Sequence, residues 1–468
     1  MAEIETPDAE DYGGRDLQVP ARHRDWTKGS ITRNLLALSW PIIVSDGLRM
    51  IGPTIDLIWV GKLGAASVAG VGISSMAVMA VTAGRMGISA GVRAMVARFV
   101  GAGDTEGSNH VAQQGLVISA VYAIVMAAIG IFFAEPILGL FGVEADVIAE
   151  GAAYMRIMFV GALAMSFQQL TESIMQASGD AVVPMRISIF YRFFHVVFCP
   201  FLVFGWWIFP RLGVSGAALT NVLSFSLATA LGLWVLFTGR SRLRLTMRNF
   251  RFDLKVTWRI IKIGIPAAVM MSERSLGRLL LVWFMAPFGT QAVAAHSIVQ
   301  RVMMFVTMIS MGFGRSAGVL VGQNLGAHQP ERAERSVWWA AGFAECVMIL
   351  CALVMLVWPE YLMRIFSPEP GLVALGAVFL RIVAVSILVI SFDQVVMHSL
   401  AGAGDTLPPM VITLLSEWVV LMPLAFLLPR VTDLGVYGVR WAMVISIFSG
   451  VIAYLIYFRL GRWKHKRV

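Results

Sequence analysis

Residues 177–185 read ASGDAVVPM, and residues 402–410 read GAGDTLPPM. In both stretches a Gly-Asp pair and a later Pro-Met pair interrupt apolar sequence, and the two copies are 225 residues apart. Glycine tolerates the left-handed conformation that ends many helices, aspartate caps a following helix, and proline suits a first helical turn. Each stretch therefore predicts a turn between two helices. Two interpretations fit this pattern. The turn is either a duplicated structural connection between spans or part of a gate that opens and closes toward the cytoplasm.

The duplication extends well beyond these turns. The same offset of 225 relates several further pairs, namely Pro41 and Pro266, Gly64 and Gly289, Gly101 and Gly326, and Arg49 and Arg274. The register then shifts, since GVSG at 213–216 corresponds to GVYG at 435–438, an offset of 222. We therefore expect two homologous halves related by an axis along the membrane normal, with a cavity between them.

The composition is that of a membrane protein. The chain of 468 residues is 58% hydrophobic and only 14% charged, whereas soluble proteins average about 25% charged residues. Residues 111–134 and 212–239 carry no formal charge, and about 20 apolar residues suffice to span a bilayer as a helix. We predict an all-α polytopic protein with twelve spans: 34–60, 66–95, 111–134, 153–178, 184–209, 213–238, 257–287, 291–318, 336–358, 372–399, 409–429 and 435–459.

The charge distribution predicts the topology. The net charge is +9, and residues 239–262 hold eight basic side chains against one acid, whereas residues 132–152 hold four acids and no Lys or Arg. Basic loops remain in the cytoplasm, so the protein is predicted to lie in the cell (inner) membrane with both termini on the cytoplasmic side. Because the basic charge is explained by topology, a nucleic-acid partner is not expected. The predicted organisation is a disordered cytoplasmic tail without a signal peptide (1–30), an N-lobe (31–238), a basic linker (239–256) and a C-lobe (257–468).

Several stretches, in this order and spacing, resemble the multidrug and toxic compound extrusion (MATE) family, and the DinF-like branch in particular. They are IDLIWVGKLGAASVAG (55–70), VGAGDTEGS (100–108), VGQNLGAHQPERAERS (321–336), GVSGAAL (213–219) and the two Gly-Asp turns. The resemblance covers roughly residues 31–460. It implies a secondary antiporter that exchanges inward H⁺ or Na⁺ for an outward amphipathic, usually cationic, compound.

The resemblance also implies where the coupling ion binds. Asp56 matches an acid that carries the ion in the family, and Pro41 matches a proline at which the first span bends. The fifth span of many members holds an Asn and an Asp four residues apart, where this chain has His195 and Cys199. Loss of that carboxylate makes a poor site for a hard cation, so H⁺ is favoured over Na⁺.

Asp56 is a candidate proton-binding residue independently of the family resemblance. Burial in a membrane protein raises the pKa of a carboxyl group and allows it to exchange protons near neutral pH. An acid in interfacial water is the alternative interpretation. His195 fits either a proton switch or a packed, hydrogen-bonded side chain.

Other ionisable residues at membrane depth form a second group of candidates, because unpaired charge there is costly. The substrate-cavity candidates are Asp46, Arg49, Glu273, Arg274, Arg301 and Asp393, with Glu172 and Glu417 as further candidates. Asp46 with Arg49, and Glu273 with Arg274, suggest ion pairs that brace the lobes. A constellation of charges that contacts substrate is the alternative.

The sequence carries no sign of enzymatic chemistry. It has no phosphate-binding glycine loop followed by lysine and no nucleophile–base pattern, so neither ATP hydrolysis nor another enzyme activity is expected. Cys199, Cys346 and Cys351 lack metal-ligand spacing and are expected to be free thiols. We expect no cofactor or metal beyond the coupling ion, a small-molecule substrate and the lipid bilayer as partners, and a monomer. A flippase of a lipid-linked or phosphorylated substrate is the alternative function, motivated by the arginines, and a membrane receptor or scaffold is a third.

Overall fold

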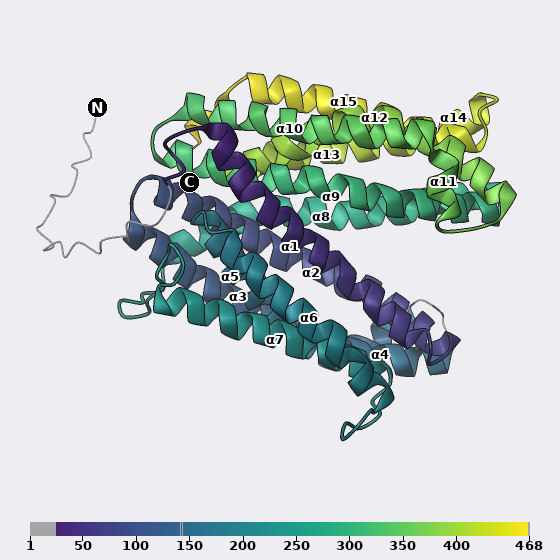
Figure 1. Cartoon of the computed structure of the whole chain (residues 1–468), viewed down its shortest axis with the longest axis horizontal. Helices are drawn as coiled ribbons and strands as arrows, with labels where there is room; N and C mark the ends of the chain where they lie inside the picture. The colour runs from purple at the N-terminus through teal and green to yellow at the C-terminus, as the bar shows by residue number, and fades with distance from the viewer. Residues whose placement is uncertain (1–24, 141, 143, 467–468) are drawn as a thin grey trace, which may run out of the picture.

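Two helical lobes form the molecule, and they meet at one end only (Figure 1). The computed structural model describes residues 25–466 apart from 141 and 143. The N-lobe contains α1 (Ile31–Val60), α2 (Ala65–Gly101), α3 (Thr105–Gly139), α4 (Ala145–Val160), α5 (Ala162–Ala177), α6 (Val182–Phe204) and α7 (Val214–Thr238). The C-lobe contains α8 (Leu254–Met285), α9 (Thr290–Gly326), α10 (Pro330–Val357), α11 (Pro359–Arg364), α12 (Pro370–Gly402), α13 (Leu407–Leu414), α14 (Met422–Val431) and α15 (Val436–Arg459).

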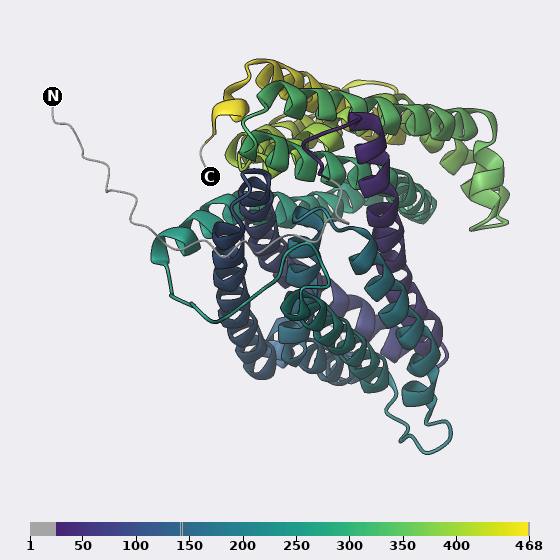
Figure 2. The same cartoon turned by 60° about the vertical axis from the view of Figure 1, so that its left-hand side comes forward.

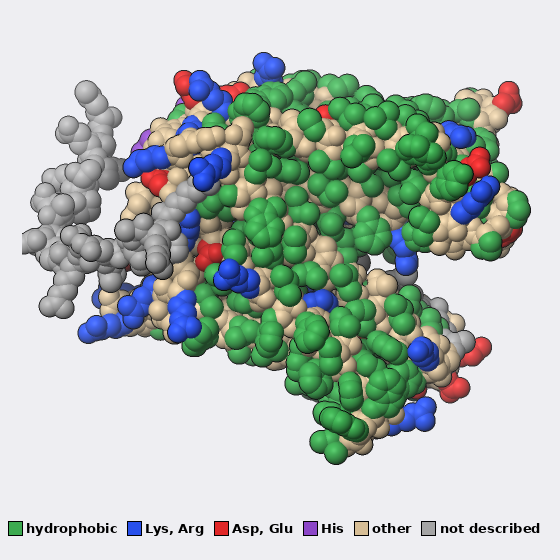
Figure 3. All heavy atoms as spheres, viewed as in Figure 1, with side chains coloured by type: hydrophobic (Ala, Val, Ile, Leu, Met, Phe, Trp, Pro, Cys, Tyr) green, Lys and Arg blue, Asp and Glu red, His purple; other side chains and the backbone are tan. Residues whose placement is uncertain are grey.

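The predicted all-α fold with two lobes is confirmed, whereas the number of twelve spans stays a prediction. Within the described residues, nine helices are long and apolar enough to cross a membrane, and α4 with α5 makes a tenth span bent by 48°. Helices α2 and α8 are 37 and 32 residues long but do not belong to that set. Figure 3 shows hydrophobic side chains over most of the visible face of both lobes, as a lipid-facing surface requires.

The lobes pack against each other in a reciprocal way. Helix α2 of the N-lobe contacts α8, while α1 contacts α9, and α2 also crosses α9. Because α8 and α9 are the repeat counterparts of α1 and α2, this exchange is what a two-fold axis between the lobes requires. Figures 1 and 2 show α1 running along the C-lobe at one end and along the N-lobe at the other.

The two ends of the molecule differ in charge and in closure. One end carries the first and last described residues, 25 and 466, and the loop between α7 and α8, and we call it the basic end. At the opposite end, which we call the open end, Figure 3 shows a deep cleft between the lobes. The lobes are therefore closed at the basic end and apart at the open end.

The two Gly-Asp turns, at residues 177–185 and 402–410, lie at the basic end. Their aspartates have different hydrogen-bond partners. Gly179 and Gly404 have φ of 90° and 80°, so both need the left-handed conformation. Asp180 accepts a hydrogen bond from the backbone N–H of Val183 at 3.2 Å and so satisfies a free N–H in the first turn of α6, although the N-cap residue itself is Ala181. Asp405 instead accepts from the Tyr457 hydroxyl at 2.5 Å and thereby ties its turn to α15.

The structure differs from the sequence-based boundaries in two places. The predicted disordered tail included residues 25–30, but Trp26 is buried and its carbonyl accepts a hydrogen bond from the Asn34 amide at 3.2 Å. Residues 1–24 lie outside the described residues. The predicted span 409–429 is present as one span, Leu407–Val431, but it is not a regular α-helix, because residues Leu415–Leu421 between α13 and α14 form a π-helix. Such insertions are common at functional sites.

Closure at the basic end depends on backbone contact at two glycines that are repeat counterparts. A Cβ added to Gly101 on α2 would lie 2.0 Å from the Gln323 carbonyl oxygen of α9, and one added to Gly326 on α9 would lie 2.0 Å from the Arg98 carbonyl oxygen of α2. Any side chain there would force the helices apart.

We therefore expect Gly101→Val to separate the lobes at the basic end. Pulsed electron paramagnetic resonance measures this separation as the distance between spin labels at the exposed positions Glu106 and Arg335. Gly342→Val is the matched control, because a Cβ at Gly342 would meet no atom within 4 Å. An unchanged distance in Gly101→Val would contradict this role for the glycine.

Candidate functional site

Asp56 lies near the open end of α1, and its side chain is enclosed by α6 and α7. It is only 4% exposed. Its Oδ1 is 3.1 Å from Nε2 of His195 and 3.8 Å from Sγ of Cys199, and its Oδ2 accepts a hydrogen bond from Nδ2 of Asn221 at 2.6 Å. The structure thus brings together Asp56, His195 and Cys199, which were predicted as the ion-coupling residues, and adds Asn221.

Helix geometry explains how these side chains converge. His195 and Cys199 are four residues apart on α6, so they share one face, and both are fully buried. Asn221 on α7 also donates to the carbonyl of Ala217 at 3.3 Å, which fixes the orientation of its amide. Asn221 was not among the residues predicted from the sequence, although an amide within the uncharged stretch 212–239 is a detectable signal.

Arg192 determines the proton position on His195. Nη1 of Arg192 is 3.2 Å from Nδ1 of His195. A guanidinium only donates hydrogen bonds, so Nδ1 must accept, and a neutral imidazole then carries its proton on Nε2 and donates it to Asp56. Gly52 makes room for this arginine, since a Cβ there would lie 2.0 Å from Nη1. Arg192 was also missed from the sequence.

The carboxylate, imidazole and thiol are also classes of ligand for a soft metal ion, and their donor atoms all lie within 4.8 Å of one another. A metal on Nε2 of His195 would, however, require the imidazole proton to move to Nδ1, where it would face the Arg192 guanidinium. The arrangement therefore fits a proton better than a resident metal ion.

A second polar group lies nearer the basic end, between the lobes. Nη2 of Arg49 donates to both carboxylate oxygens of Glu172 at 2.9 and 2.8 Å, while Asp46 is 3.8 Å away. Arg315 of the C-lobe hydrogen-bonds Asp46 and donates to Oε1 of Gln176 at 3.0 Å. The predicted Asp46–Arg49 pair is thus secondary, because each residue has a better partner on another helix.

In the C-lobe the predicted pair of Glu273 with Arg274 is wrong. Both carboxylate oxygens of Glu273 are buried and lack a hydrogen-bond partner among the described residues. Arg274 donates instead to Sδ of Met397 at 3.1 Å. Glu273 faces Glu417 of the π-helix across Gly277, where the nearest oxygens of the two acids are 3.5 and 3.6 Å from the position of an added Cβ. Adjacent residues on a helix point about 100° apart, which explains the failure.

The two lobes differ in the partner of an arginine at equivalent positions of the repeat. Arg49 and Arg274 are counterparts at 225 residues, and so are their partners Glu172 and Met397. Asp393 on α12, the remaining acid candidate of the C-lobe, accepts a hydrogen bond from the Gln394 amide at 3.1 Å. Arg301 is exposed on α9 and forms no ion pair with a described residue.

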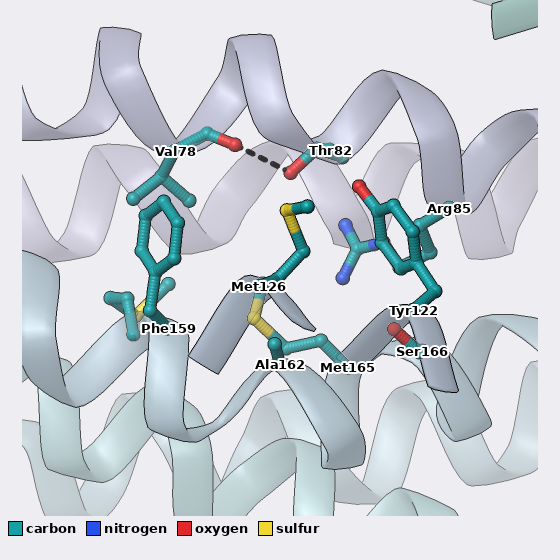
Figure 4. A pocket seen from close by; sticks show the side chains of 10 residues that line it. Val78, Thr82, Arg85, Tyr122, Met126, Phe159, Ala162, Met165 and Ser166 are labelled. Carbon is teal, nitrogen blue, oxygen red and sulfur yellow. Dashed lines mark hydrogen bonds between the residues drawn. The ribbon is translucent and has the colours of Figure 1, made fainter. Parts of the chain in front are cut away.

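The N-lobe also holds a small cavity between α2, α3, α4 and α5 (Figure 4). Its volume is about 30 Å³, and Arg85, Tyr122, Met126 and Phe159 are among its lining residues. A cavity of this size has room for one or two water molecules but not for an organic substrate. The cleft between the lobes is therefore the better candidate for a substrate site.

A family model described as MatE matches residues 41–201 and 266–427. The chain belongs to the MATE family. The two matched segments begin 225 residues apart, which is the offset of the internal repeat. The predicted family is confirmed, whereas the DinF-like branch stays a prediction.

Relatives of MATE type cover nearly the whole chain. It is 26% identical to the probable multidrug resistance protein YpnP of Bacillus subtilis (strain 168), over 94% of this chain and 97% of the relative. It is 23% identical to the probable multidrug resistance protein NorM of Thermotoga maritima, over 94% of each chain. Among solved structures, a MATE protein in a bent conformation superposes with a TM-score of 0.87 at 21% identity, covering 93% of this chain and 96% of that one.

Proposed function

We propose that this MATE transporter is a proton-coupled antiporter that exports amphipathic organic compounds by alternating access between its lobes. The observation that carries the proposal is the enclosure of Asp56 by His195, Cys199 and Asn221. A buried carboxylate in contact with an imidazole is a site that can hold a proton, and an opening and closing cleft can present that site to either side of the membrane.

The donor set supports H⁺ over Na⁺. A hard cation takes several oxygen ligands, and the side chains around Asp56 offer one carboxylate and one amide, with imidazole and thiol in the other positions. The Asn221 amide donates to Asp56, so its nitrogen, and not its oxygen, faces the carboxylate. Na⁺ would need this amide to turn around.

Direction and substrate class are parts of the same proposal. We place the basic end in the cytoplasm, as the positive-inside rule predicts for the loop between α7 and α8, so the cleft opens outward. The C-lobe acids Glu273, Asp393 and Glu417 support a substrate with a cationic centre. The relatives YpnP and NorM are described as multidrug resistance proteins, which favours export of drugs over the flippase alternative.

Transport in sealed vesicles, with the pH and Na⁺ gradients imposed separately, tests the coupling ion. We expect a pH gradient to drive counter-movement of a fluorescent organic cation, because the site around Asp56 binds protons in preference to hard cations. We expect no response to a Na⁺ gradient at equal pH on both sides. Transport that follows the Na⁺ gradient and ignores the pH gradient would refute the proposal.

A further inference from the structure

The C-lobe contains a buried arginine whose charge no carboxylate balances. Arg440 lies on the first turns of α15, which begins at the open end of the molecule (Figure 1), and its side chain is 0% exposed. It takes part in none of the ion pairs formed among the described residues. A guanidinium is strongly basic, and a buried positive charge is costly without an anion beside it.

The contacts of Arg440 leave much of its guanidinium without a hydrogen-bond acceptor. Its Cζ lies 4.4 Å from the centre of the Phe379 ring on α12, and its Nη1 donates to Sδ of Met443 at 3.8 Å. An aromatic face and a thioether are weak partners for a positive charge. Nε and Nη2 are buried and have no hydrogen-bond partner among the described residues. Two such donors on one charged group call for an acceptor from outside the chain, either an anion or water.

His296 on α9 adds a third polar group in the same part of the lobe. It is 1% exposed, its Nδ1 has no hydrogen-bond partner among the described residues, and it lies within electrostatic range of Arg440. Helix α12 packs against both α9 and α15, and Ala295 and Val439, the neighbours of His296 and Arg440 along the chain, belong to one buried apolar cluster with Phe379. A neutral imidazole can carry its proton on Nδ1 and donate it to an anion held by the guanidinium.

The repeat relates this region to the surroundings of Asp56 in the N-lobe. At the offsets of 225 and 222, the counterparts of His296, Phe379 and Arg440 are Val71, Tyr154 and Ala218, which share a buried cluster with Cys199. In the other direction, Asp56 and Asn221 correspond to Leu281 and Met443. The C-lobe therefore carries a positive charge in the region where the N-lobe carries a negative one. A ligand of this region should accordingly be an anion, whereas Asp56 attracts a cation.

We propose that Arg440 and His296 form a binding site for a small inorganic anion, chloride under cellular conditions, inside the C-lobe. A monatomic anion suits the few N–H donors in an otherwise apolar cluster, whereas phosphate has several oxygens, and some of them would stay unpaired there. The bound anion balances the guanidinium and joins α15 to α9. Because Arg440 is enclosed within one lobe, the proposal does not depend on the substrate, the coupling ion or the direction of transport.

Thermal unfolding of the detergent-solubilised full chain tests this site. The protein is equilibrated in sodium chloride or in sodium gluconate at equal ionic strength, and unfolding is followed by tryptophan fluorescence. We expect chloride to raise the unfolding temperature of the wild type in a saturable way, by about 2–4 °C, because a ligand of the folded state stabilises it. Arg440→Met removes the charge and replaces it with an apolar side chain. This variant should not respond to chloride and should be at least as stable as the wild type in gluconate.

Arg381→Met is the matched control, because Arg381 is an exposed arginine on α12 of the same lobe, and this variant should keep the chloride response. Anomalous scattering from wild-type crystals grown in bromide locates the anion directly, and it decides the question even if Arg440→Met does not fold. We expect a bromide peak beside Arg440 and His296. No chloride response in the wild type, an unchanged response in Arg440→Met, or the lack of a bromide peak at these side chains would each overturn the proposal and assign the unpaired N–H groups to bound water.

Discussion

Asp56→Asn is expected to abolish gradient-driven export while leaving the protein folded and inserted. Amide replaces carboxylate at nearly equal volume, so packing against His195 and Cys199 changes little. What is lost is the titratable charge, and with it any difference in proton affinity between outward-open and inward-open states. A ligand shifts a conformational equilibrium only by its differential affinity for the two states. The gradient would then have nothing to act on at this site.

The measurement pairs the affinity for a fluorescent organic cation in detergent with pH-driven transport in vesicles. Affinity should stay within a few-fold of wild type, because the substrate-cavity candidates Asp46 and Arg49 lie nearer the basic end of α1 than Asp56. Glu135→Gln serves as the control, since Glu135 is an exposed carboxylate that pairs with Arg156 at 2.8 Å. Wild-type transport by Asp56→Asn would move the coupling role to another acid. Loss of both binding and transport would mean that proton and substrate share Asp56.

The sequence was sufficient for the fold because the fold rests on local and repeated signals. Uncharged stretches such as 212–239 identify helices that lipid can surround, and the 225-residue offset identifies the two lobes. The sequence was a less reliable guide where a helix is bent or irregular. The bend at Gly161 and the π-helix Leu415–Leu421 depend on packing against neighbouring helices, and the residues themselves give no periodic signal.

The candidate site was only partly accessible from the sequence. Asp56, His195 and Cys199 were selected by family resemblance, and the structure brings them together. Arg192 was missed because its role depends on the room left by Gly52 on another helix. Ion pairs were predicted from neighbours along the chain, whereas the partner of Arg49 is 123 residues away. Side-chain pairing in a membrane bundle is set by tertiary contact, which sequence spacing within one helix does not report.

Substitution of Arg315 is also expected to have a large effect, because Arg315 forms an ion pair between the two lobes. It lies on α9 of the C-lobe and hydrogen-bonds Asp46 on α1 of the N-lobe and Gln176 on α5. Arg49 also lies 3.8 Å from Asp46, but on the same helix. Arg49 therefore accompanies Asp46 in every state of the transporter, whereas Arg315 reaches Asp46 only when the basic end is closed. Only the second contact has a different energy in the two states.

Arg315→Gln should accordingly open the basic end. Breaking one partner of a buried ion pair costs about 3–5 kcal/mol, and even half of the lower figure shifts a two-state equilibrium about tenfold. The electron-resonance distance between labels at Glu106 and Arg335 should lengthen, and transport should fall. Asp46→Asn should act in the same direction, while the exchange Asp46→Arg with Arg315→Asp should restore part of the closed population. If Arg315→Gln left the distance distribution unchanged, closure would have to rest on the other contacts between the lobes, such as the backbone contacts of α2 with α8 and α9. Because Asp46 and Asp56 lie on the single continuous helix α1, a displacement of α1 that follows protonation at Asp56 would also move Asp46 relative to Arg315, which gives the proton a direct mechanical route to the closed end.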